Sequence, residues 1–101
     1  MSGPASTPAA LRQAPEPPEG AAAPLKALWH AARGEWDAAH RLVQDEAGRD
    51  AAWVHAHLHR IEGDPGNARY WYARAGRPPS EDPLEQEWDK IALELLDRPM
   101  S

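Results

Sequence analysis

The sequence has no cysteine and no phenylalanine among its 101 residues, and the first absence limits its chemistry most. Without cysteine there are no disulfides, no thiolate metal ligands and no cysteine nucleophile. Serine occurs only at positions 2, 6, 80 and 101, and the chain has neither a Gly-x-Ser-x-Gly motif nor a phosphate-binding loop. We therefore expect a protein that is not an enzyme and that carries no cofactor.

Long apolar runs and an excess of basic residues are also missing. No stretch reaches the roughly 18 apolar residues of a transmembrane helix, and the first residues do not resemble a secretory signal. Residues 25–79 contain eight basic and seven acidic residues, and residues 80–101 contain two basic and seven acidic ones. This balance does not indicate a nucleic-acid binder. We expect a cytoplasmic protein with neither nucleic-acid nor membrane partners.

Residues 1–24 differ in composition from the rest of the chain. Six of the 11 prolines lie here, and Leu11 is the one large aliphatic residue after Met1. Such a segment buries too little apolar surface to offset the entropy of ordering its backbone. We predict a disordered tail over residues 1–24 and a folded domain over residues 25–98.

The folded part shows helical periodicity and no strict alternation of apolar and polar residues. The pattern predicts an all-α fold of five helices, with Asp50 and Asn67 as N-caps of the third and fourth. Asp82 followed by Pro83 and Glu85 has the spacing of a capping box. The predicted helices cover about 25–33, 36–47, 51–62, 68–75 and 83–97.

An internal repeat appears when the sequence is shifted by 29 residues. The shift aligns two alanine pairs, a histidine pair and a glycine pair: Ala27 with Ala56, Ala39 with Ala68, His30 with His59, and Gly34 with Gly63. Alanine allows close helix approach, and glycine allows a tight turn. We predict two antiparallel helical hairpins, with the amphipathic C-terminal helix covering the second.

Two segments carry a family resemblance. Residues 34–39, Gly-Glu-Trp-Asp-Ala-Ala, are similar to the Gly-Asp-Tyr-x-x-Ala core of tetratricopeptide repeats. Residues 68–76 resemble the Ala-x-x-Trp-Tyr-x-basic-Ala pattern of Sel1-like repeats. The resemblance covers residues 24–79, although the 29-residue offset is shorter than the usual ~34 residues. It implies helical hairpins that form a protein-binding module with a concave ligand surface.

The resemblance also implies where a partner binds. Trp53 lies off the apolar stripe of its own helix, on a face that lines the concave surface in the repeat family. The implied strip binds a peptide or partner helix, and Leu28 of the first hairpin lies beside it. Exposed apolar ends of two stacked hairpins also allow a homodimer. The predicted partner-binding residues are Leu28, Asp50, Trp53, His57 and Arg60.

The histidines offer an alternative function. His55 and His59 are four residues apart, so they share a helix face and can bind one metal ion, while His57 points elsewhere. A zinc site needs further ligands, and no Glu base lies between the two histidines. We principally expect no metal site, because histidines at these positions are also ordinary polar residues of a half-exposed helix. The alternatives are a metal-binding module that uses His55 and His59, or a small His-based enzyme.

Overall fold

The computed structural model describes residues 7–98 of the chain. The regular secondary structure in this range is helical. No strand occurs in this range, so the all-α prediction is confirmed. None of its helices is long and apolar enough to span a bilayer. The elements are α1 (Pro8–Gln13), α2 (Ala23–Ala32), α3 (Trp36–Val43), α4 (Arg49–Glu62), α5 (Pro65–Ala75) and α6 (Leu84–Leu96).

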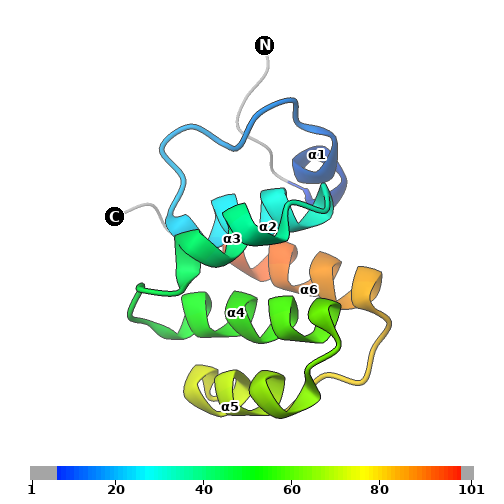
Figure 1. Cartoon of the computed structure of the whole chain (residues 1–101). Coiled ribbons are helices and arrows are strands. Elements are labelled where there is room, and N and C mark those ends of the chain that lie inside the picture. Colours follow the sequence, from blue (N-terminus) through cyan, green and yellow to red (C-terminus); the bar gives the residue numbers. More distant parts are fainter. Residues whose placement is uncertain (1–6, 99–101) are drawn as a thin grey trace.

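The helices form successive layers, as Figure 1 shows. Helix α5 packs on α4, and α4 packs on the α2–α3 pair. Helix α6 returns from the far end of the chain and packs against α1, α2 and α4. The last helix therefore contacts helices from both halves of the domain, whereas we had expected it to cover the second hairpin.

The turns that follow α2 and α4 have the same local structure. Gly34 and Gly63 both adopt left-handed backbone conformations, with φ angles of 74° and 83°. A backbone N–H just after each glycine donates to a carbonyl of the preceding helix, Glu35 to His30 at 3.0 Å and Asp64 to His59 at 2.8 Å. These bonds satisfy carbonyl groups that the end of a helix leaves free. The glycine stops that we predicted at both positions are confirmed.

Four predicted helix starts are wrong by one to three residues. Helix α2 begins at Ala23, two residues before the predicted start at 25. Helix α4 begins at Arg49 after Gly48, two residues before the start at 51 that an Asp50 N-cap predicted. Helix α5 begins at Pro65, because the Asp64 carboxylate caps it by accepting the Asn67 N–H at 3.2 Å. Helix α6 begins at Leu84 with no side-chain cap, and Asp82 instead accepts a bond from Lys90 at 3.4 Å.

The predicted disorder of residues 1–24 is wrong for the described residues 7–24. Residues 1–6 lie outside the described range. Thr7 caps α1 by accepting the Ala10 N–H at 3.1 Å, and Pro8 occupies its first turn, where proline is well tolerated. Leu11 is 0% exposed and belongs to the core. The prediction failed because the average composition of the segment does not reveal a short helix that buries a single large apolar side chain.

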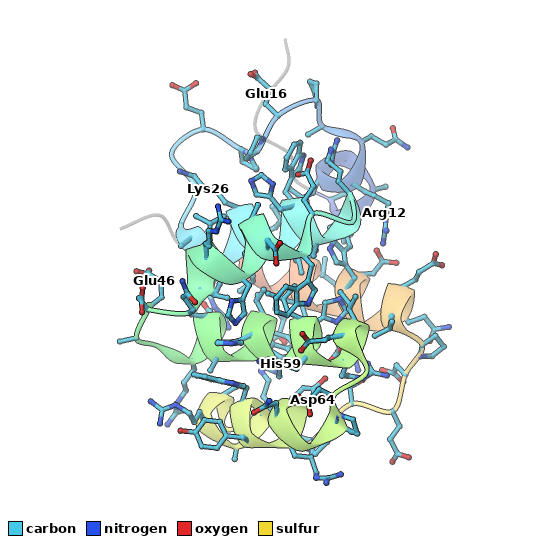
Figure 2. All side chains as sticks on the ribbon, viewed as in Figure 1. Arg12, Glu16, Lys26, Glu46, His59 and Asp64 are labelled. Carbon is cyan, nitrogen blue, oxygen red and sulfur yellow. The ribbon has the colours of Figure 1, made fainter. Side chains whose placement is uncertain are left out.

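Three further contacts hold α1 to the domain. The indole Nε1 of Trp29 donates to the Ala14 carbonyl at 3.0 Å. The Arg12 guanidinium lies 4.2 Å above the ring of Trp88 and pairs with Asp89 at 2.8 Å. The N-terminal segment thus packs on α2 and α6, and Arg12 is labelled on it in Figure 2.

Candidate metal centre

Three histidines from two helices converge between α3 and α4. His40 lies on α3, and His55 and His59 lie one turn apart on α4. One ring nitrogen of each lies within 4.8 Å of the other two, and the Nε2 atoms of His40 and His55 are 3.0 Å apart. His55 and His59 are buried and His40 is half-buried. The predicted pair therefore shares a face, and α3 supplies a third histidine that the sequence argument missed.

Aromatic rings hold this three-histidine cluster (His40, His55 and His59) in place. The ring of Trp36, one turn before His40, stacks on His40 with centroids 4.7 Å apart and planes at 10°. Trp71 of α5 stacks on His55 at 3.8 Å and 14°. The indole Nε1 of Trp36 donates to the Leu58 carbonyl at 2.7 Å, which fixes that ring against α4. Packing restricts the rotamers of both His40 and His55 before any ligand binds.

The environment of His55 favours the neutral imidazole. Burial, together with the neighbouring His40 and His59, lowers the pKa of His55 to about 4 from its ordinary 6.5. At neutral pH its ring therefore carries one nitrogen lone pair, which is the form that binds metals. The Nδ1 atom of His55 is buried and has no hydrogen-bond partner among the described residues. A buried polar atom without a partner costs about 1–3 kcal/mol, and an ion bound at Nε2 would leave this cost in place, because Nδ1 points away from His40.

The spacing of the three nitrogens is close to that of a tetrahedral site. Zn–N bonds of about 2.0–2.1 Å place two ligand nitrogens about 3.3 Å apart. The separation of 3.0 Å between the His40 and His55 nitrogens is already near this value. The remaining separations, at most 4.8 Å, need to shorten by about 1.5 Å or less to reach it. Placing all three rings on one ion therefore requires the stacked rings of His55 and His59, whose planes lie at 17°, to rotate until both nitrogens point at it.

Two carboxylates, those of Glu62 and Asp64, lie near His59. Nδ1 of His59 lies 3.0 Å from Oε1 of Glu62, one turn along α4. Asp64, at the beginning of α5, has a carboxylate oxygen within 4.8 Å of the same two residues. Figure 2 labels His59 on α4 and Asp64 at the turn into α5. The cluster thus has imidazoles as its inner groups and a carboxylate hydrogen-bonded to one of them.

The predicted partner-binding strip is not exposed. Leu28, Trp53 and His57 are 0%, 3% and 1% exposed, and Asp50 and Arg60 are half-buried. The prediction that Trp53 lies on an open concave surface is therefore wrong. Trp53, His57 and Arg60 do share one face of α4, as their spacing indicates, but that face lies inside the molecule.

The C-terminal part of the chain covers this strip. The Trp88 indole donates to the Leu28 carbonyl at 2.8 Å, and the Arg77 guanidinium lies 3.5 Å above the ring of Trp53. Glu87 bonds both His57 and Arg60 at 2.7 Å, and Arg98 pairs with Asp50 at 3.0 Å. All five residues of the strip thus contact α6 or the segments that flank it.

Glu87 is the centre of the most buried polar contact in this region. Its side chain is 1% exposed and accepts hydrogen bonds from His57 Nδ1, Arg60 and the Tyr72 hydroxyl. Burial alone would raise the pKa of Glu87, but these three donors outweigh burial and lower it. Burial and the Glu87 carboxylate raise the pKa of Tyr72. Glu87 therefore stays ionised and fastens α6 to α4 and α5.

Comparisons with protein-family models, with curated proteins and with solved structures give no match.

Proposed function

We propose that this protein binds a transition-metal ion through His40, His55 and His59. The observation that carries the proposal is the convergence of three imidazole rings, from α3 and α4, with ring nitrogens within 4.8 Å of one another. The neutral state of His55 supports the same interpretation. Metal binding was the alternative function in the sequence analysis, and the burial of the strip removes the support that Trp53 gave to partner binding.

The donor set determines which metals fit. All three ligands are imidazoles, which suit Zn²⁺, Cu²⁺, Ni²⁺ and Co²⁺, whereas Mg²⁺ and Ca²⁺ prefer oxygen ligands. Three protein ligands leave at least one coordination position of a tetrahedral ion for water or another small ligand. We therefore expect binding of borderline divalent ions and no competition from millimolar Mg²⁺.

Metal titration of the untagged, chelator-treated protein tests the proposal. A histidine tag must be absent, since it would bind the same ions. Isothermal titration calorimetry with ZnSO₄ or NiSO₄ is expected to show one ion per chain at the cluster. His55→Ala and His40→Ala should each weaken binding at least tenfold, because each removes one of three ligands.

His30→Ala is the matched control. His30 is aligned with His59 in the repeat and likewise lies near a carboxylate, at 2.7 Å from Glu35, but it is not one of the three clustered histidines. It should bind metal as the wild type does. Equal binding by the wild type and His55→Ala, or no binding by either, would contradict the proposal.

We also infer that α2–α3 and α4–α5 are two tetratricopeptide-like hairpins. The buried alanine pairs and the shared glycine turns support this inference. A protein-binding role would need a surface other than the predicted strip, because the C-terminal segment covers that strip. An experimental structure in which the two helix pairs do not superimpose would contradict the hairpin assignment. The aligned buried alanines are Ala27, Ala39, Ala56 and Ala68.

A further inference from the structure

The carboxylate beside the cluster has a role of its own. We propose that Glu62 is the positioning residue that orients His59 toward the metal, an inference that rests on the metal-binding function proposed above. Nδ1 of His59 lies 3.0 Å from Oε1 of Glu62. Because a carboxylate is an acceptor, this contact requires the proton of His59 to be on Nδ1. The lone pair of the neutral ring is then on Nε2, which is the nitrogen left for the metal.

Glu62 has the geometry of an outer-sphere partner rather than of a ligand. Metal-binding histidines commonly donate their second ring N–H to a carboxylate, which fixes the tautomer and makes the ligand more basic. Glu62 lies three residues after His59 on α4, so one helical turn holds the two side chains together. The His59 side chain is 10% exposed, whereas that of Glu62 is 45% exposed. The carboxylate therefore reaches the buried ring from the solvent side.

His59 and His55 differ in the hydrogen-bond partner of their Nδ1 atoms. His59 has a carboxylate on Nδ1, whereas Nδ1 of His55 is buried with no hydrogen-bond partner among the described residues. The ring of His59 stacks nearly parallel to that of His55, with centroids 5.0 Å apart and planes at 17°. Glu62 thus orients one ring of the stacked pair through a hydrogen bond, while Trp71 holds the other by stacking. Its negative charge also offsets part of the positive charge that a divalent ion brings into the cluster.

Metal titration of Glu62 variants is the first arm of the test. Glu62→Ala should weaken Zn²⁺ binding about 10–100-fold while the stoichiometry remains one ion per chain. Glu62→Gln keeps a carbonyl acceptor for Nδ1–H, so its affinity should lie between those of Glu62→Ala and the wild type. Glu35→Ala, which removes the equivalent carboxylate from His30 away from the cluster, should bind as the wild type does. Far-UV circular dichroism confirms that each variant is folded.

The second arm uses the metal-free protein. Long-range ¹H–¹⁵N correlation spectra at slightly alkaline pH should show His59 as the Nδ1–H tautomer, and Glu62→Ala should shift it toward Nε2–H. The absence of this tautomer, or unchanged metal affinity in Glu62→Ala, would overturn the role of Glu62. A stoichiometry that falls from two ions to one would also overturn it, because Glu62 would then be a ligand of a second ion with His59 and Asp64. If the wild type binds no metal, the proposed function fails, and the tautomer alone decides whether Glu62 orients His59.

Discussion

Replacing Glu87 by glutamine tests how the C-terminal helix is fastened to the domain. Glu87 is buried and accepts hydrogen bonds from His57, Arg60 and Tyr72. A hydrogen bond to an ionised group contributes roughly 1.5–3 kcal/mol, against about 0.5–1.5 kcal/mol for one between neutral groups. Glutamine keeps the volume but loses the charge and one of the two acceptor oxygens. The contacts with His57 and Tyr72 therefore weaken and Arg60 loses its ion-pair partner, at about 1 kcal/mol each and about 3 kcal/mol together.

Urea denaturation at neutral pH, followed by tryptophan fluorescence and circular dichroism, measures this loss. A fall of about 3 kcal/mol in the free energy of unfolding is a substantial fraction of the roughly 5–15 kcal/mol expected for a domain of this size. Glu85→Gln is the matched control, because Glu85 is exposed on the same helix. It should change stability by less than about 0.5 kcal/mol. If Glu87→Gln costs no more than this control, the three hydrogen bonds do not stabilise α6 as argued.

The remaining predictions concern acid, the N-terminal helix, a helix cap and the metal. Because folding lowers the pKa of Glu87, its stabilisation is complete above the ordinary value of 4.5 and disappears as the pH falls through the lower folded-state value. In urea denaturation at acid pH, the stability difference between wild type and Glu87→Gln should therefore narrow below that pH; a constant difference would argue against an ionised Glu87. Leu11→Ala removes a fully buried side chain and should lower the free energy of unfolding, measured by urea denaturation, by about 2–5 kcal/mol. The loss is smaller if α1 detaches before the rest of the domain unfolds. A disordered tail would show no change in the free energy of unfolding. Asp64→Ala removes the cap of α5 and should cost about 1 kcal/mol by thermal denaturation, and no loss would mean that the cap is not formed. Zn²⁺ at 100 times its dissociation constant should stabilise the wild type by about 2.7 kcal/mol and His55→Ala by much less, which differential scanning calorimetry can compare.

The sequence was sufficient for the helical architecture because periodicity and glycine stops are local signals. The turns at Gly34 and Gly63 lie where the pattern indicates, and five of the helices in residues 7–98 correspond to predicted ones. Helix α1 was missed because its stability depends on the burial of Leu11 against other elements, which no composition average reports. The same segment does contain a helix start signal, Thr7 followed by Pro8.

The candidate site was predictable only in part. The spacing of His55 and His59 places both on one helix face, but the third histidine comes from another helix. Whether His40 meets that pair depends on how α3 crosses α4, which is a property of packing. The grouping of Trp53, His57 and Arg60 on one face was also correct, and its interpretation failed because the occupant of that face is α6. Helical periodicity identifies a surface but does not tell which segment of the same chain covers it.

The position of α6 has a consequence for how the chain folds during synthesis. The bond between the Trp88 indole and the Leu28 carbonyl joins residues 60 positions apart, and Glu87 supplies the partner for His57 from 30 positions away. A ribosome releases the N-terminal end first, so α2 and α4 exist for some time without the residues that complete their inner face. Repeat arrays gain stability step by step as each unit contacts its neighbour. This chain instead must be released as far as α6 before the inner faces of α2 and α4 are covered.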